Sequence, residues 1–440
     1  MIIFDDIPEE LNPDGLLEKV AAVQNLGEIM AEHSLSEEAL YKIESGIETV
    51  TRHLIAMACE DGFNGNLWQV FLTLLLINHE NPFTLSAERN GVCNGGLLEA
   101  AEHDLQEFYE YFQADLNEVA DQTDLPLLKL IADFPCEVKK PKNYSTFIRD
   151  KILALRDTLA EAKTVRAMTD SLLDFYRDYG VGAVGLHKAF RIEGGFEKRE
   201  PVVIAPVRNI RHVSLDDLVG YEIAKEELVR NTLSFVEGRK ANNCLLYGDA
   251  GTGKSTSIKA IANQFYKDGL RIIEVYKHQF QDIHDVIAQI KNRNYKFILY
   301  MDDLSFEDFE TEYKYLKAVI EGGLEKRPEN VLIYATSNRR HLVKEKFSDK
   351  ASLDEDDIRH SDTVQEKLSL AHRFGVAIYF GPPTRKDFNR IVKTLADRNG
   401  ITLPEEELIA EATKWEIAHG GLSGRCAQQF IDYLQGESRA

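Results

Sequence analysis

The chain has 440 residues, of which 44% are hydrophobic, and its formal net charge is −21 at pH 7. This length and apolar content predict two or three globular domains. The acidic balance argues against a protein that coats nucleic acid, although it leaves local contacts with nucleic acid open. Five cysteines without a C-x-x-C pair argue against a zinc site or a disulfide framework and fit a reducing compartment.

The start of the chain and its apolar runs indicate neither export nor membrane insertion. Met1–Asp6 ends in two acids, where a secretory signal needs a basic stretch. The most apolar run, Leu67–Ile77, is about eleven residues long and too short to cross a bilayer, so we interpret it as a buried helix. We therefore expect a cytoplasmic protein without a membrane partner.

Apolar residues at three- and four-residue steps recur through residues 1–200 and predict an all-α domain. Between Tyr144 and Tyr179 an apolar stripe predicts one long helix. This region has no internal repeat and no catalytic constellation, so we expect it to recognise a partner or a neighbouring subunit. The segment Glu197–Pro206 mixes charges and prolines, and there we predict a hinge and a domain boundary.

The segment Gly248–Ser255 has the spacing G-x-x-x-x-G-K-[ST] and lies between an apolar run, Cys244–Tyr247, and a helical pattern, Thr256–Tyr266. Strand, glycine loop and helix in this order can cradle phosphate. Glycines adopt positive φ and let successive N–H groups turn inward, and the helix N-terminus is electropositive. We expect Lys254 to reach the β- and γ-phosphates and the Ser255 hydroxyl to ligate Mg²⁺. A glycine-rich turn that happens to precede a lysine is the plainer alternative. The predicted nucleotide-binding residues of this segment are Gly248, Asp249, Ala250, Gly251, Thr252, Gly253, Lys254, Ser255 and Thr256.

A continuous apolar run, Phe297–Met301, ends in Asp302 and Asp303. Such a run predicts a strand that is covered on both faces of a parallel sheet. Acids at the carboxyl end of this strand are expected beside the phosphate loop, where open α/β sheets bind ligands. We predict that Asp302 holds Mg²⁺ through water and that Asp303 polarises the attacking water. The alternative is a pair of solvated loop acids.

Three further polar residues are candidates for the same site. Asn338 follows the apolar run Val331–Ser337, a position from which it can orient water or touch the γ-phosphate. Arg425 lies in the first turn of the last predicted helix, where a cation is unfavourable, so we expect an anionic partner. Arg373 precedes another strand, Val376–Phe380, but spacing alone leaves it a candidate or a surface arginine.

The order of these motifs between Asn209 and Ala440 resembles the AAA+ superfamily of ring-forming ATPases. The resemblance implies an α/β P-loop NTPase fold, a five-stranded parallel αβα sandwich followed by a small helical lid from about Pro383. It divides the chain into a helical N-terminal domain (1–200), a nucleotide-binding domain (201–382) and a helical lid (383–440). The resemblance implies that the segment Asp217–Tyr221 lies beside the adenine, with Val219 and Gly220 as nucleotide-binding residues. It implies Walker A at Gly248–Ser255 and Walker B at Phe297–Asp303. It also implies that Asn338 is sensor 1, Arg373 is the arginine finger and Arg425 is sensor 2.

A narrower resemblance is to a bacterial family of predicted ATPases known as domain of unknown function 815. It rests on the segments Asp302–Glu307, Thr336–Leu342 and Glu366–Leu370. That family also has a helical N-terminal half. The resemblance implies an ATPase but no substrate.

The chain departs from the superfamily pattern at two places. The second acid of Walker B is Asp303 instead of glutamate, so activation of water is weaker or Glu307 assists. The loop Tyr276–Phe280 lacks the aromatic-then-glycine pore loop of threading unfoldases, which argues against peptide translocation.

The leading hypothesis, which combines these residues with what the resemblance implies, is an ATP-hydrolysing, Mg²⁺-dependent homo-oligomer that remodels a protein or macromolecular partner. One alternative is a nucleic-acid-linked loader, which the acidic charge does not favour. Another is a nucleotide-gated switch that hydrolyses slowly. The acidic segment Asp354–Asp357 is interpreted as a solvated insertion or a gate for a partner.

Overall fold

The computed structural model describes residues 2–4, 6–19, 37–138, 141–208, 213–306, 312–321, 328–338, 370 and 373–437. The chain forms two compact units, Met1–His187 and Lys188–Ala440. The sequence analysis put the first boundary after residue 200, whereas the first unit ends at His187, because the segment that follows joins the sheet of the second unit. Glu307 and Asp354–Asp357 lie outside the described residues.

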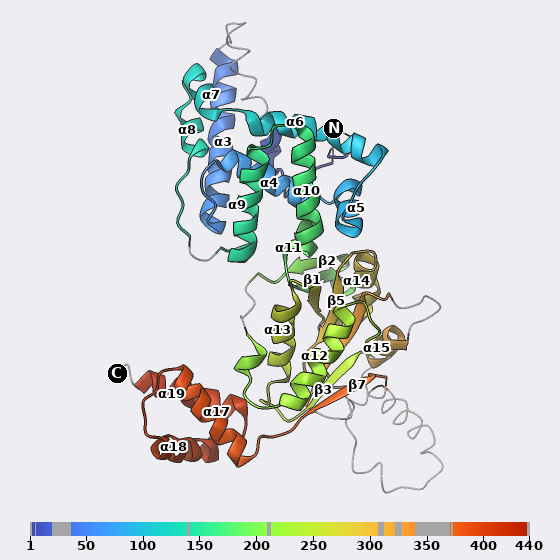
Figure 1. Ribbon diagram of the computed structural model, residues 1–440, viewed down its shortest axis with the longest axis vertical. Helices are drawn as coiled ribbons and strands as arrows, with labels where there is room; N and C mark the ends of the chain where they lie inside the picture. Colours follow the sequence, from blue (N-terminus) through green and yellow to red (C-terminus); the bar gives the residue numbers. More distant parts are fainter. Residues whose placement is uncertain are drawn as a thin grey trace. The chain divides into compact units, whose positions relative to one another are not determined.

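The first unit consists of helices (Figure 1). A short 3-10 turn, η1 (Pro13–Gly15), precedes them. The described helices are α3 (Glu37–Asp61), α4 (Leu67–Asn78), α5 (Pro82–Asn90), α6 (Gly96–Gln113), α7 (Leu116–Thr123), α8 (Pro126–Ala132), α9 (Thr146–Ala160), α10 (Val165–Tyr179) and α11 (Gly182–Leu186). The described part of this unit is helical, as the periodicity predicts, but the predicted all-α region of residues 1–200 extends too far, because a strand already begins at Ala189.

Helix α4 is the centre of this unit, because it contacts α3, α6, α8, α9 and α11. Its sequence is apolar on every side, as a helix surrounded by other helices requires. Asn66 begins it by accepting the N–H of Gln69. The buried helix predicted from the apolar run is therefore confirmed. Its buried residues are Leu67, Trp68, Val70, Phe71, Leu72, Thr73, Leu75, Leu76 and Ile77.

The single long helix predicted between Tyr144 and Tyr179 is wrong, because the structure has two helices there, α9 and α10. Thr164 separates them: its side chain accepts the N–H of Ala167 and caps α10. A threonine in this position satisfies a backbone donor that a continuing helix would have used. The apolar stripe continues across the break, which is why periodicity alone did not reveal it.

The second unit contains a seven-stranded sheet in the order β2-β1-β4-β5-β6-β3-β7. All strands are parallel except β2, which pairs antiparallel with β1. The resemblance implied five strands, and the two additional ones extend the sheet beyond β4. The strands are β1 (Ala189–Gly195), β2 (Glu200–Pro206), β3 (Cys244–Gly248), β4 (Leu270–Glu274), β5 (Lys296–Met301), β6 (Val331–Ser337) and β7 (Val376–Phe380).

The hinge predicted at Glu197–Pro206 is wrong, because this segment forms a 3-10 turn, η2 (Phe196–Lys198), and the edge strand β2. Prolines are tolerated on an edge strand, where one row of backbone groups faces away from the sheet. The prolines and charges that suggested a linker are thus typical of a protected sheet edge.

Both faces of the central strands are buried, which explains their continuous apolar sequence. In β5, Ile298 and Tyr300 belong to the core that α12 (Glu222–Val236) and α13 (Lys254–Phe265) complete on one face (Figure 1). The alternate residues Phe297, Leu299 and Met301 are also buried. The other elements of the central part are η3 (Leu215–Asp217), η4 (Lys277–Asp282), α14 (Ile283–Ile290) and α15 (Glu312–Glu321).

The lid consists of α17 (Arg385–Arg398), α18 (Glu405–Ala418) and α19 (Gly424–Glu437). These helices have a hydrophobic core of their own, which includes Phe388, Val392 and Phe430. Thr384 begins α17 by accepting the N–H of Asp387. The predicted α/β P-loop sandwich with a C-terminal helical lid is confirmed. In the described ranges, none of the helices is long and apolar enough to cross a membrane.

Candidate nucleotide-binding site

A cavity of about 840 Å³ lies where the phosphate loop, the ends of β5 and β6 and the lid meet. It brings together most of the residues that the sequence singled out. Gly248, Asp249, Gly220 and Arg373 are not among its lining residues. The predicted residues that line it are Val219, Ala250, Gly251, Thr252, Gly253, Lys254, Ser255, Thr256, Asp302, Asp303, Asn338 and Arg425.

Two glycines of the phosphate loop are required because other parts of the chain pass very close to them. Gly248 has φ 134°, and a Cβ there would collide with the carbonyl oxygen of Phe380. Gly253 has φ 97°, and a Cβ there would collide with the side chain of Leu218. Only glycine combines such φ values with this lack of space. The loop therefore presents bare backbone at the start of α13, which suits a phosphate group.

Lys254 is held by three oxygens inside the loop. Its Nζ donates to the carbonyls of Gly248 at 2.8 Å and Asp249 at 2.7 Å, and to Oδ1 of Asn338 at 3.1 Å. Its side chain is almost fully buried, and this burial lowers the pKa of Lys254 from its ordinary value. Anionic phosphate oxygens beside Nζ would favour the charged amine.

Asp302 is surrounded by hydroxyl donors. Its Oδ1 accepts the Ser255 hydroxyl at 2.7 Å and the Thr336 hydroxyl at 2.6 Å. Burial by itself would raise the pKa of Asp302, but the hydrogen bonds from Thr336 and Ser255 lower it overall. The group is therefore a carboxylate at neutral pH. It lies beside the hydroxyl that the sequence assigned to the same metal ion.

Asp303 has a left-handed backbone with φ 50°, which aspartate tolerates better than most residues. Its N–H donates to Oγ1 of Thr336 at 2.9 Å, and its Oδ1 accepts Nδ2 of Asn338 at 2.7 Å. Thr336 thus bridges both acids. The sequence analysis missed this residue, although a hydroxyl near the end of an apolar strand was a usable signal.

The two predicted arginines lie differently. The backbone N–H of Arg425 donates to the carbonyl of Gly251 at 3.2 Å, so α19 begins against the phosphate loop. Arg373 donates its backbone N–H to Leu370 and does not line the cavity. Its role as an arginine finger stays a prediction.

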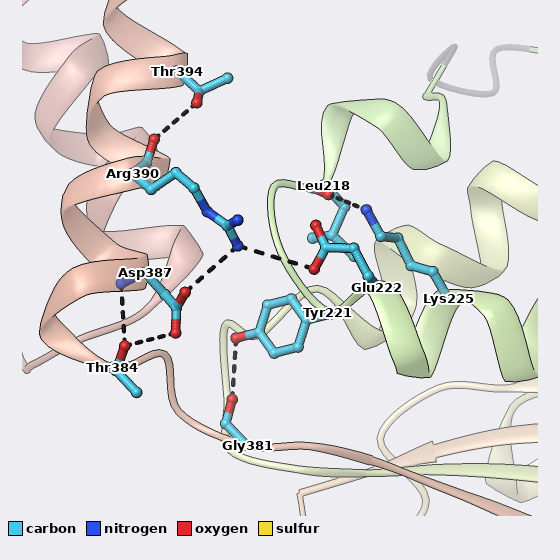
Figure 2. A network of polar contacts seen from close by, with 9 residues as sticks. All are labelled: Leu218, Tyr221, Glu222, Lys225, Gly381, Thr384, Asp387, Arg390 and Thr394. Carbon is cyan, nitrogen blue, oxygen red and sulfur yellow. Dashed lines mark hydrogen bonds and ion pairs between the residues drawn. The ribbon is translucent and has the colours of Figure 1, made fainter.

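A polar network that the sequence did not reveal connects the lid to the nucleotide-binding core (Figure 2). Arg390 of α17 lies 3.5 Å from Asp387 and 4.0 Å from Glu222, which begins α12. The Tyr221 hydroxyl donates to the carbonyl of Gly381, the residue after β7, at 3.1 Å. Farther along α17, Arg398 donates to the carbonyl of Asp216 at 2.7 Å. Isolated lid arginines carry no sequence pattern that points to a partner in the core.

These residues fit a magnesium nucleotide. Glycine amides and Lys254 suit the phosphates, while Ser255 and Asp302 provide two oxygen ligands. Mg²⁺ is usually held by one or two carboxylates together with substrate phosphates. Accordingly, the described part of the chain has no cluster of three or more His, Cys, Asp or Glu that could hold a metal ion by itself.

Comparisons with known proteins give partial matches to curated relatives. One of them is the replication factor C large subunit of Methanococcus vannielii, 37% identical over 84 residues, which are 19% of this chain and 16% of the relative. The chain therefore spans about a sixth of the length of that protein.

Among solved structures, similar chains include variants of RuvB from Thermotoga maritima. One variant is 17% identical, with a TM-score of 0.37, over 52% of this chain and 65% of that chain. A structure described as the RuvB Holliday junction branch migration motor of the same organism is 16% identical, with a TM-score of 0.33, over 51% of this chain and 73% of that chain.

A family model described as protein of unknown function (DUF815) matches residues 187–438, more than half of the chain. The matched region contains the whole sheet, the phosphate loop, both acids and the lid. The chain therefore belongs to the family described as protein of unknown function (DUF815).

Proposed function

We propose that this protein binds ATP with Mg²⁺ in the cavity and hydrolyses it to ADP and phosphate. One observation supports this above all. The buried Lys254, the two carboxylates Asp302 and Asp303, and Asn338 form one connected set of hydrogen bonds around the phosphate loop. A purely structural glycine turn has no need of a buried amine next to two acids.

The binding roles follow from the contacts. The amides of Gly251 and Gly253 would face phosphate oxygens, and Lys254 would exchange its carbonyl acceptors for them. Val219 lines the cavity next to Gly220 and would flank the base. Ser255 and Asp302 would hold Mg²⁺, which when bound neutralises charge on the transferring phosphoryl group.

The water-activating role falls to Asp303 and Asn338. Asn338 donates to Oδ1 of Asp303 at 2.7 Å and so fixes the direction of the carboxylate. The second oxygen of Asp303 would accept the proton of the attacking water. Positioning of the water and charge stabilisation then provide most of the catalysis.

We further propose that the protein acts as a homo-oligomer and couples hydrolysis to the remodelling of a protein or macromolecular partner. Arg373 lies away from the cavity lining of its own chain, which supports a role in the site of a neighbouring subunit. Arg425 starts the lid helix at the phosphate loop, so it would respond to the nucleotide from within the same chain. The helical first unit would recognise the partner. A cytoplasmic location stays a prediction.

A second candidate is a nucleotide-gated switch with slow hydrolysis. The Asp303 carboxylate is one methylene shorter than the usual glutamate, and Asn338 already occupies one of its oxygens. Both features support weaker activation of water. A third candidate, an ATPase linked to nucleic acid, is supported by the segment similar to the replication factor C large subunit.

The test uses the full chain, three variants of predicted site residues and one control variant. Lys254→Ala is expected to weaken ATP binding about 10- to 100-fold in calorimetry, because it removes a charged donor. Asp303→Asn is expected to keep binding and to lose about 100-fold or more of the phosphate release. Arg373→Ala is expected to bind ATP as the wild type does. Its ATP turnover is expected to fall and no longer to rise with protein concentration, because that rise depends on an arginine from a neighbouring subunit. The exposed Lys240→Ala is the control and is expected to change neither quantity.

The outcomes separate the candidates. A wild-type chain that binds no magnesium nucleotide at millimolar concentration contradicts the proposed function. Turnover that stays near zero at every protein concentration favours the switch. Salt-dependent binding to DNA favours the nucleic-acid-linked ATPase. Affinity capture with Asp303→Asn, which should retain nucleotide, then tests for a partner.

A further inference from the structure

Two cysteines of the helical unit approach one another from distant positions in the sequence. The Cys136 thiol donates to the carbonyl oxygen of Ala58 at 3.4 Å, although these residues are 78 positions apart. Ala58 directly precedes Cys59, so standard backbone dimensions put the Cys136 sulfur within roughly 6–7 Å of the Cys59 Cα.

Backbone contacts on both sides hold this approach in place. Gly65 and Phe134 form an antiparallel bridge, with N–H to carbonyl distances of 3.0 and 2.9 Å. Beyond Cys136, Asn143 donates its N–H and its side-chain amide to Asp61, a carboxylate that is 2% exposed. The end of α3 is therefore tied to the chain before and after Cys136. A disulfide requires the Cα atoms to lie about 4.4–6.8 Å apart, and a fixed approach of Cys136 to the backbone next to Cys59 favours its formation.

The two thiols differ in their access to solvent. Cys59 is exposed and Cys136 is partly buried, while Cys93, Cys244 and Cys426 are buried. Burial raises the pKa of Cys136, and its contact with Cys59 raises it further. Oxidants react with exposed thiols first. An oxidant therefore reaches the Cys59 thiol first, and the neighbouring Cys136 thiol can then react with the oxidised Cys59.

We propose that Cys59 and Cys136 form a reversible oxidation site that a peroxide converts into an intramolecular disulfide. In the first step the Cys59 thiolate attacks the peroxide, an S–O bond forms, the O–O bond breaks, and water or an alcohol leaves. In the second step the Cys136 sulfur attacks the Cys59 sulfur, the S–S bond forms, the S–O bond breaks, and water leaves. Two thiols together lose two electrons and two protons, and the peroxide is reduced.

The disulfide closes a loop around the centre of the helical unit. The chain between Cys59 and Cys136 contains α4 to α8, including the helix on which the hydrophobic core is built. A cross-link across so long a loop restricts the unfolded chain and stabilises the closed unit. The site requires no nucleotide and does not depend on the proposed ATPase activity.

The experiment treats the full reduced chain with hydrogen peroxide and maps its thiols by mass spectrometry. We expect a cross-linked peptide pair containing Cys59 and Cys136, about 2 Da lighter than the reduced peptides, which a dithiol reductant restores. Far-UV circular dichroism is expected to stay unchanged. Cys59→Ser should abolish the cross-link, whereas the matched Cys93→Ser, at a buried cysteine, should leave it intact.

Three results overturn the proposal. The first is a chain whose Cys59 is oxidised to sulfinic or sulfonic acid while Cys136 remains a thiol. The second is a disulfide that joins Cys59 of two separate chains. The third is a Cys59–Cys136 disulfide that forms only with loss of helical signal, because the pair is then not positioned in the folded unit.

Discussion

The sheet side and the lid side of the nucleotide cavity are built from polar contacts of different strength. On the sheet side, Oδ1 of Asp302 accepts hydroxyl donors from Ser255 at 2.7 Å and from Thr336 at 2.6 Å. On the lid side, Arg390 and Glu222 lie 4.0 Å apart, and their side chains are 52% and 61% exposed. Hydrogen bonds to a charged group contribute about 1.5–3 kcal/mol, whereas exposed ion pairs contribute about 0–1 kcal/mol.

This difference indicates which part of the cavity is fixed before a ligand arrives. The sheet side has its acids and its amine in place through short contacts between β5, β6 and the phosphate loop. The lid side is held by a few solvent-exposed contacts (Figure 2). A ligand that binds one lid position slightly better than another can shift such an equilibrium. Under the proposed function, a bound nucleotide would therefore adjust the lid and leave the sheet side unchanged.

Among the variants that test this comparison, Thr336→Val is expected to have the largest effect on stability and on nucleotide binding. It keeps the shape of the side chain and removes the hydroxyl. The N–H of Asp303 loses its acceptor and Asp302 loses a donor, so the free energy of unfolding should fall by about 2–4 kcal/mol. Binding of magnesium nucleotide in calorimetry should weaken at least about tenfold. A variant that binds as tightly as the wild type shows that this bridge does not position the acids.

The sequence was sufficient to predict that the phosphate loop and the two acids lie beside one cavity, because a loop after one parallel strand and acids after another meet at the same edge of the sheet. Their roles towards a nucleotide stay predictions. Gly248 and Gly253 are needed wherever the loop passes so close to Phe380 and Leu218. Thr336 was missed for a physical reason. Its importance arises from the pairing of β6 with β5, and a single strand read along the chain does not show which neighbour its hydroxyl reaches.

An intermediate effect is expected at two buried tyrosines of the sheet. The Tyr300 hydroxyl is buried beside Asp302 and Ser255 without a hydrogen bond of ordinary geometry, whereas the Tyr334 hydroxyl contacts Asn231 at 2.9 Å and Thr232 at 3.0 Å. An intramolecular hydrogen bond contributes about 1 kcal/mol, so Tyr334→Phe should destabilise the nucleotide-free protein by about that amount. Tyr300→Phe, the matched variant, should change the stability by less.

Thermal unfolding measures both changes, and the melting temperature should fall by roughly 2–4 °C in Tyr334→Phe and shift by less in Tyr300→Phe. The Tyr300 hydroxyl is the exception to a sheet side with well-formed hydrogen bonds, and Tyr300→Phe therefore sharpens the comparison. A loss of stability in Tyr300→Phe as large as that in Tyr334→Phe contradicts it, because the Tyr300 hydroxyl then forms an equally strong hydrogen bond in solution.

The fold was predictable where apolar runs mark buried strands and less so at the edges. The edge strand Glu200–Pro206 was not predicted, because it contains prolines near both ends. Edge strands also lack the apolar pattern by which central strands are identified. The contacts of the lid could not be predicted from the sequence either. Arg390 and Glu222 belong to helices that are far apart in the sequence, and both helices carry several surface charges, so charge alone does not show which residues pair.

The smallest effect is expected from Arg390→Ala, which removes the ion pair with Glu222 and the contact with Asp387. Because these side chains are exposed, ATP affinity should change by less than about fivefold, corresponding to about 1 kcal/mol. The change should disappear as salt rises from 50 to about 500 mM, because salt screens exposed charges. Lys393→Ala is the matched control, since its pair with Glu405 lies within the lid, and it should leave affinity unchanged. If Arg390→Ala instead weakens binding more than Thr336→Val, the lid side is the fixed one and the comparison is reversed.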